Sequence, residues 1–183
     1  MTAATLSDLP GDARILFTDG STNPALRIGV GAAMAVPRAW LERDADQILP
    51  DEVAALTVSR RFTDTSSTRL ELETVLWAMR EHAPGKVSLA LGTDSQCVAG
   101  LPARRERLEA TAFVSGASGA ELRHADLYRE FYRELDRRPV ALFKLAGHAD
   151  YRYQEAAQRI FHFVDREARR QLKRWMRELD RAA

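Results

Sequence analysis

The stretch Ile15-Leu16-Phe17-Thr18-Asp19-Gly20-Ser21 indicates a buried β-strand that ends on a carboxylate. Three apolar residues and a threonine form the short continuous run of an interior strand, and Gly20 marks a turn after it. A carboxylate at such a place is costly to bury unless a cation, a metal ion or a helix N-terminus compensates its charge. An Asp-Gly pair is also an ordinary turn signal. The meaning of Asp19 therefore depends on whether other carboxylates reach comparable positions.

On either side of this strand, the chain alternates between strand and helix patterns. Further strands are expected at 28–36, 53–62, 87–93 and 140–145, and helices at 69–82, 95–100, 103–112, 124–138 and for about 25 residues from 154. Residues 37–51 are polar and predict an irregular insert or a short helix. Three strands joined by modest connections indicate an antiparallel meander. The whole order predicts an α/β domain with a five-stranded mixed sheet and a long C-terminal helix.

Composition bounds the class of protein. The 183 residues, 45% of them hydrophobic, predict one domain over 1–183, with 1–13 as a flexible N-terminal tail. A net charge of +1 gives no global basic bias, so any nucleic-acid surface must be local. The single Cys97 excludes an internal disulfide and a cysteine zinc site, which fits a cytoplasmic protein. We expect neither a signal peptide nor a membrane-spanning segment, and we expect a monomer.

A second buried strand, Val87-Ser88-Leu89-Ala90-Leu91-Gly92-Thr93-Asp94, also delivers an aspartate at its end. If the two strands are neighbours in the sheet, Asp19 and Asp94 lie within a few ångströms of each other. Two facing carboxylates repel unless one is protonated or a cation bridges them. Hard oxygen ligands without cysteine and with few histidines favour Mg²⁺ or Mn²⁺ over zinc.

Further acidic ligands are available on two predicted helices. Glu71 and Glu73 both flank the apolar stripe near the start of the helix at 69–82, and periodicity does not choose between them. Asp165 follows the apolar Val164 on the last helix and can turn inward. Each of these residues alone is typical of helix-surface charge. Their order together with Asp19 and Asp94 is what indicates a shared site.

The chain resembles the type 1 ribonuclease H family in six short segments that occur in family order. They are Thr18-Asp19-Gly20-Ser21, Thr68-Arg69-Leu70-Glu71-Leu72, Thr93-Asp94-Ser95-Gln96, His124-Ala125-Asp126-Leu127-Tyr128, Gly147-His148-Ala149 and Val164-Asp165-Arg166-Glu167-Ala168-Arg169. The resemblance implies a ribonuclease H-like fold. It also selects Glu71 over Glu73, because the family's glutamate precedes a leucine and follows an arginine and an apolar residue.

The resemblance further implies a metal-dependent endonuclease that hydrolyses the RNA strand of RNA–DNA hybrids. Asp19, Glu71, Asp94 and Asp165 would bind two divalent ions on either side of the scissile phosphate. Cleavage would leave a 5′-phosphate and a 3′-hydroxyl. His148 matches the family's histidine, which is thought to assist proton transfer or product release.

Substrate contacts are also implied by motif position. Gly20 and Ser21 would shape the backbone beside the groove, Gln96 matches a family glutamine near it, and Ser67 and Thr68 stand where the family often has two asparagines. The family's basic handle would fall between residues 103 and 121. Here it contains Arg104 and Arg105, interleaved with acidic residues and lacking tryptophan, which is also typical of a solvated helix face.

Alternatives remain at this point. The same fold could act on double-stranded RNA or branched DNA, or serve as a catalytically silent nucleic-acid-binding or partner-binding module. Loss of a carboxylate usually accompanies silence, and all four are present. A basic C-terminal run through Arg169, Arg170, Lys173, Arg174 and Arg177 either follows a phosphate backbone or is simply solvated.

Overall fold

A computed structural model describes residues 10–85, 87–143, 145 and 151–182, with side chains in the last helix described from residue 155. Its five strands form one sheet in the order β3-β2-β1-β4-β5. They are β1 (Arg14–Asn23), β2 (Ile28–Pro37), β3 (Val58–Thr63), β4 (Leu89–Gly92) and β5 (Val140–Phe143). The first three strands pair antiparallel, whereas β4 pairs parallel to both β1 and β5. This confirms the predicted five-stranded mixed sheet.

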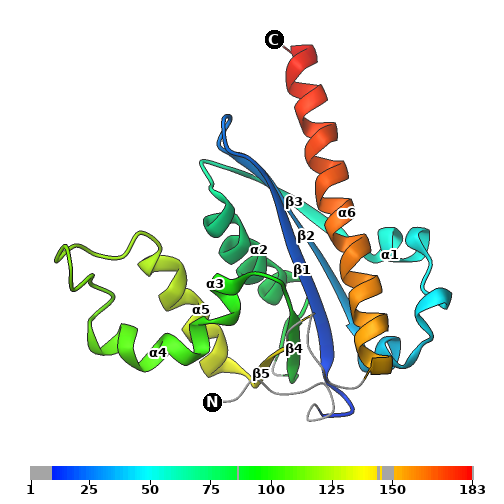
Figure 1. The fold of residues 1–183 in the computed structure, drawn as a ribbon, viewed down its shortest axis with the longest axis horizontal. Coiled ribbons are helices and arrows are strands. Elements are labelled where there is room, and N and C mark those ends of the chain that lie inside the picture. The colour runs from blue at the N-terminus through cyan, green and yellow to red at the C-terminus, as the bar shows by residue number, and fades with distance from the viewer. Residues whose placement is uncertain (1–9, 86, 144, 146–150, 183) are drawn as a thin grey trace.

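Helices cover both faces of the sheet (Figure 1). On one face lie α2 (Ser67–Glu81), α3 (Gln96–Ala99), α4 (Leu101–Ala110) and α5 (Ala125–Arg137). On the other face lie α6 (Tyr151–Ala182) and the segment after β2, which contains η2 (Arg38–Glu42), η3 (Ala45–Gln47) and α1 (Pro50–Leu56). None of the described helices is long and apolar enough to cross a membrane.

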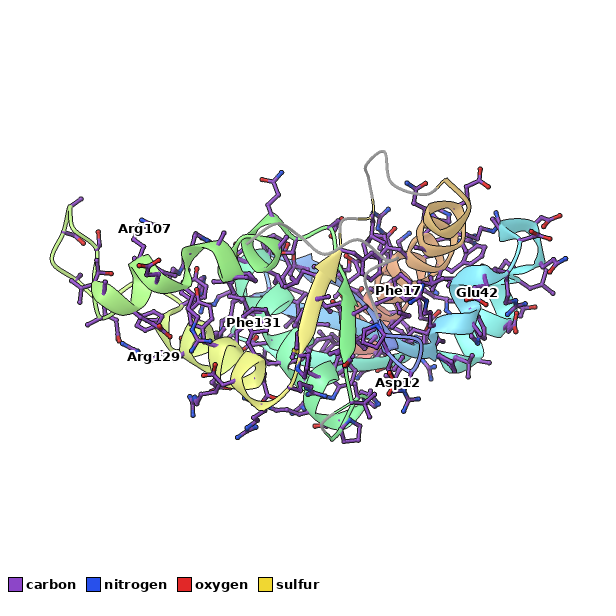
Figure 2. The ribbon with its side chains drawn as sticks, turned by 90° about the horizontal axis from the view of Figure 1, so that it is seen from below. Asp12, Phe17, Glu42, Arg107, Arg129 and Phe131 are labelled. Carbon is purple, nitrogen blue, oxygen red and sulfur yellow. The ribbon has the colours of Figure 1, made fainter. Side chains whose placement is uncertain are left out.

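Alternation along β1 divides the core into two layers. Ile15 and Phe17 pack with α6, while Leu16 between them packs with α2 and α5. Successive strand residues point to opposite faces, so one uninterrupted apolar run supplies both layers. Figure 2 shows Phe17 on the α6 side of the sheet and Phe131, from α5, on the other side. Both side chains are fully buried.

Three predicted boundaries differ from the structure. β1 continues to Asn23, so Asp19 lies inside the strand, because β2 pairs with all ten of its residues. The predicted strand at 53–62 is wrong in its first part, since residues 53–56 belong to α1. Pro50 begins that helix and acidic residues occupy its first turn, both of which favour a helix N-terminus. α6 runs for 32 residues, longer than the predicted 25 or so.

Helix α2 approaches the β1–β2 hairpin closely because glycines face it. A Cβ atom built on Gly20 would lie 2.9 Å from Leu70 Cδ2, and one built on Gly31 would lie 2.2 Å from Thr74 Oγ1. A side chain at Gly31 would require Thr74 or the helix backbone to shift, whereas one at Gly20 would require the tip of Leu70 to move. The small residues of the hairpin therefore set the height of α2, and with it the position of Glu71, above the sheet.

Candidate active site

The first two acidic residues are brought side by side by parallel pairing. β1 and β4 run in a register that pairs Phe17 with Gly92, and Asp19 and Asp94 each come two residues later. Parallel neighbours carry equivalent positions to the same edge of a sheet. The carboxylate of Asp19 is half-buried and that of Asp94 is exposed. The expectation that these two strands are neighbours is confirmed.

Asp165 approaches the same place from α6. The helix packs on β1 through its apolar side, on which Val164 is fully buried, and the next residue stands at the margin of that contact with 19% of its side chain exposed. Asp19 shares the α6-facing side of β1 with Phe17, because the two residues are two positions apart. A hydrogen bond links the side chains of Asp19 and Asp165. Arg169, one turn further along α6, contacts Asp165 with 2.8 Å between Nε and Oδ1.

Burial together with the neighbouring charges of Asp165 and Asp94 raises the pKa of Asp19 to about 7. Burial is the largest cause, and a hydrogen bond from the backbone of Gly20 opposes it. Like charges at short range disfavour simultaneous ionisation. The group therefore holds a proton up to near-neutral pH when no cation is present.

Glu71 reaches the site from the first turns of α2. Ser66 caps this helix, its hydroxyl accepting a hydrogen bond from the backbone of Arg69 at 3.4 Å. Glu71 accepts a hydrogen bond from the hydroxyl of Ser95, the residue that follows Asp94 and caps α3. Glu73 is turned elsewhere, toward Arg69 at 2.9 Å and Thr65 at 3.2 Å. Of the two glutamates, Glu71 is the one beside the end of β4.

The four carboxylates offer the oxygen atoms that a divalent ion prefers, but their side chains do not converge on one point. Among the described residues, no three acidic, histidine or cysteine side chains converge closely enough to hold one ion. Asp165 is instead paired with Arg169, and Glu71 with Ser95. Carboxylates that repel one another take other partners when no cation holds them together. Ion binding would require these two side chains to turn from their present partners, while all donors are the oxygens that Mg²⁺ and Mn²⁺ prefer.

The predicted substrate contacts come from β1, the start of α2 and the start of α3. Gly20 and Ser21 are half-buried in β1, Ser67 is exposed, and the Ser67 hydroxyl lies 3.2 Å from that of Thr22 in the hairpin. Thr68 is half-buried in the first turn of α2. Gln96 is exposed and lines, with Asp94 and Phe161, a cavity of about 660 Å³ between α3 and α6.

A second cavity at the N-terminus of α2 is lined by the predicted substrate contact Ser67 and also by Arg123 and His124, to which the sequence assigned no role. Its volume is about 690 Å³, and its lining includes Ser66, Ser67, Arg69, Arg123 and His124. His124 Nδ1 is buried and has no hydrogen-bond partner within the described residues. Burial first, and then the charges of Arg123 and Arg69, lower the pKa of His124. The family-like segment that opens at His124 was the only sequence signal for this position.

The predicted handle arginines are engaged within the protein. Arg104 donates to the backbone carbonyls of Cys97 at 2.6 Å and Gly100 at 3.0 Å. Arg105 forms ion pairs with Asp136 at 2.6 Å and Glu109 at 2.8 Å. These contacts use N–H donors of both guanidinium groups that would otherwise be available to phosphate. The role of Arg104 and Arg105 in substrate binding stays a prediction. His148 lies outside the described residues.

Comparisons with known proteins relate the chain by fold. Neither the protein-family models nor the curated proteins gave a match. Among solved structures, a foamy viral protease-reverse transcriptase in complex with dsDNA superposes with a TM-score of 0.56 and 14% identity, over 87% of this chain and 97% of that one. A foamy viral protease-reverse transcriptase in complex with an RNA/DNA hybrid gives 0.61 and 13%, over 88% of this chain and 20% of that one. The chain therefore has a ribonuclease H-like fold, which it shares with these structures at low sequence identity.

Proposed function

We propose that the chain is a metal-dependent endonuclease that hydrolyses the RNA strand of RNA–DNA hybrids. The observation that carries this proposal is the grouping of Asp19, Asp94 and Asp165 at a partly buried place, where burial first and then the charges of the other two carboxylates raise the pKa of Asp19 to about 7. A fold gains nothing in stability from collecting carboxylates that repel one another, so such a group is a candidate functional site. The ribonuclease H-like fold supports the same reaction class by analogy.

Four residues would hold two Mg²⁺ or Mn²⁺ ions: Asp19, Glu71, Asp94 and Asp165. Bound at this site, the ions would supply an activated water and stabilisation of the leaving 3′ oxygen, so that the products carry a 5′-phosphate and a 3′-hydroxyl. Asp19 would lose its proton when the site is loaded. Glu71 would leave Ser95, and Asp165 would leave Arg169, to complete the ligand set. His148 is proposed to assist proton transfer or product release.

The groove side of the site would recognise the hybrid by its sugars. The hydroxyls of Ser67 and Thr68, and the amide of Gln96, would hydrogen-bond to nucleotide sugars. The 2′-hydroxyl, both donor and acceptor, distinguishes an RNA strand from DNA. Gly20 and Ser21 would shape the backbone of β1 beside the groove.

Nucleases of this fold that cut double-stranded RNA or branched DNA are the second candidate. One observation favours this alternative. Arg105, which would bind the backbone of a hybrid, is paired with Asp136 and Glu109 instead. The presence of all four carboxylates argues against a silent binding module.

The proposal is tested by incubating the protein with end-labelled RNA–DNA hybrid, duplex RNA, duplex DNA, branched DNA and single strands. Each substrate is tested with Mg²⁺, with Mn²⁺ and with chelator. We expect metal-dependent cutting of the RNA strand of the hybrid only, with 5′-phosphate termini on the downstream fragments. Cutting of duplex RNA or branched DNA in place of the hybrid would select the second candidate. No cutting of any substrate would sink both.

Asp94→Asn is the matching variant for this assay. It removes a charged oxygen donor from an exposed side chain with almost no change in volume, so we expect turnover to fall by at least about 100-fold while the thermal unfolding midpoint changes little. Asp12→Asn, an exposed aspartate just before β1, is the control with the same charge change. Equal activity in the two variants would remove Asp94 from the site.

A further inference from the structure

The part of α6 that follows Asp165 carries the densest positive charge on the molecule's described helices. Residues 166–181 contain seven cations and three acidic residues, a local charge of +4 in a chain whose total is +1. We call the seven cations the basic stripe: Arg166, Arg169, Arg170, Lys173, Arg174, Arg177 and Arg181. The rest of the chain therefore carries a net negative charge, and the stripe is a local feature that the total conceals.

The basic stripe faces away from the sheet. The opposite side of α6 contributes Ala168, Leu172 and Trp175 to the core, whereas every member of the stripe is exposed. At about 100° per residue the seven cations fall within an arc of about 140°. In Figure 1, α6 runs beside the β1–β2 hairpin and projects past its tip. The stripe is thus presented to solvent along the whole second half of the helix.

The cations of the stripe are available for a partner. Three of them, Arg169, Arg170 and Arg174, form ion pairs with acidic residues of the same helix, and these arginine side chains remain 66%, 68% and 72% exposed. Asp51 of α1 adds a further attraction at Arg170. Within the described part of the chain, Arg166, Lys173, Arg177 and Arg181 form no ion pair. Exposed pairs within a helix contribute little stability and exchange readily for phosphate. Arg105 on α4 differs, because Asp136 from another helix holds its guanidinium in a bidentate pair.

The position of the stripe links it to the candidate active site. It begins at Arg166, directly after the proposed ligand Asp165, and its second member contacts that carboxylate. Beside its first two turns is a cavity of about 410 Å³ against α1, lined in part by Arg166, Arg170 and Lys173. From Asp165 to Arg181 the helix rises about 24 Å, the axial length of roughly seven nucleotide steps.

We infer that the basic stripe binds the phosphate backbone of the duplex substrate as it leaves the active site. This rests on the proposed function, because it assigns the same substrate a second contact surface. The stripe would supply the attraction for substrate phosphates that Arg104 and Arg105 can supply only in part, because both side chains are engaged within the protein. Phosphate contacts of this kind position a duplex without reading its sequence.

The test is the salt dependence of binding to a fluorescent RNA–DNA hybrid of roughly 20 base pairs, in chelator so that no turnover occurs. In Lys173→Gln/Arg177→Gln, both substitutions are exposed and remove charge without touching the core. We expect affinity to fall about 10-fold at roughly 100 mM salt. We expect the slope of log affinity against log salt to flatten by up to about 2, because each phosphate contact contributes about 0.9. Lys173→Arg should keep the wild-type slope.

Arg14→Gln/Arg133→Gln, at two exposed positions on β1 and α5, is the control with the same change of charge. An equal loss in both double variants, or an unchanged slope in the first, would overturn the inference. So would a loss seen only with vesicles containing anionic lipid and not with the hybrid. If the protein cuts the hybrid but the salt dependence of binding is the same in wild type and in Lys173→Gln/Arg177→Gln, the inference about the stripe is wrong and the proposed function stands. Absence of both cutting and binding would sink the proposed function with it.

Discussion

The surroundings of the Asp19 carboxyl group disfavour its ionisation. It is half-buried, hydrogen-bonded to Asp165 and close to Asp94, and these surroundings raise its pKa to about 7. An ordinary aspartate titrates near 4, so the metal-free fold must either protonate this residue or accept the repulsion. A divalent cation would remove both costs at once. The same residue thereby links the stability of the free protein to the proposed activity.

We expect Asp19→Asn to stabilise the metal-free protein at neutral and alkaline pH. Because the folded-state pKa of Asp19 lies above its unfolded value of 3.8, the folded state binds more protons between about pH 4 and pH 7. Its contribution to the free energy of unfolding therefore falls as pH rises through that window. At pH 8 the asparagine variant should gain up to about 4 kcal/mol relative to wild type, and little at pH 4.

Urea unfolding in chelator at several pH values measures this difference, with Asp12→Asn as the control. A gap between wild type and Asp19→Asn that stays constant from pH 4 to pH 8 would contradict the raised pKa. Adding Mg²⁺ or Mn²⁺ should stabilise wild type alone, because binding to the folded state raises its apparent stability.

At the scale of elements, the contact between α2 and the β1–β2 hairpin positions one ligand relative to the others. Gly20, Gly29 and Gly31 all face α2, and a Cβ atom added to any of them would meet Leu70 or Thr74. The helix can therefore sit lower over the hairpin than side chains of ordinary size would permit. The strand that carries Asp19 and the helix that carries Glu71 are held together by these glycines.

Gly31→Ala should destabilise the protein by about 1–3 kcal/mol, because its Cβ would lie 2.2 Å from Thr74 Oγ1 and 2.8 Å from Thr74 Cγ2. The β-branched Thr74 is buried and has little freedom to move. Thr74→Ala in the same chain should restore most of the loss, giving a coupling energy that denaturant unfolding of the four proteins in the cycle can measure. Gly116→Ala, where nothing lies within 4 Å, is the control and should be near neutral. Additive effects at Gly31 and Thr74 would show that α2 is free to shift.

At the scale of the whole molecule, β1 joins the layers into one unit. It pairs with β2 on one side and β4 on the other, and its two faces contribute to separate apolar clusters with α6 and with α2 and α5. A third cluster, containing Leu172 and Trp175, attaches the second half of α6 to β2. Loss of β1 would open the first two clusters directly and would remove the strand that pairs with β2, so we expect the layers to unfold together.

The three tryptophans offer a direct test, because each one reports on a different cluster. Trp40 packs at the margin of the α6 layer, Trp77 in the α2 layer and Trp175 between α6 and the hairpin. We expect three single-tryptophan proteins, with the other two residues changed to phenylalanine, to give coincident urea transitions when normalised to their own stability. The far-ultraviolet circular dichroism of each protein should follow the same curve. An earlier transition at Trp175 alone would mean that the second half of α6 detaches first.

Much of this fold was readable from local sequence. Apolar runs placed the strands, and helical periodicity placed α2, α5 and α6. Two element boundaries were predicted wrongly. Val53 has the β-branched character of a strand residue, yet Pro50 and the acidic first turn make its segment helical and its side chain joins the α6 layer. β1 was predicted too short because its second half depends on pairing with β2.

For the candidate site, sequence alone determined which carboxylates exist, on which kinds of element and in what order. Tertiary structure decided which of them meet, because the meeting of Asp19 and Asp94 depends on the register between β1 and β4, and that of Asp165 on the packing of α6. It also decided that Arg105 is held by Asp136, 31 residues away, and that the basic stripe remains exposed. Helix and strand preferences act between near neighbours in the chain. Charges and hydrogen bonds act through space, so their partners are known only once the chain has folded.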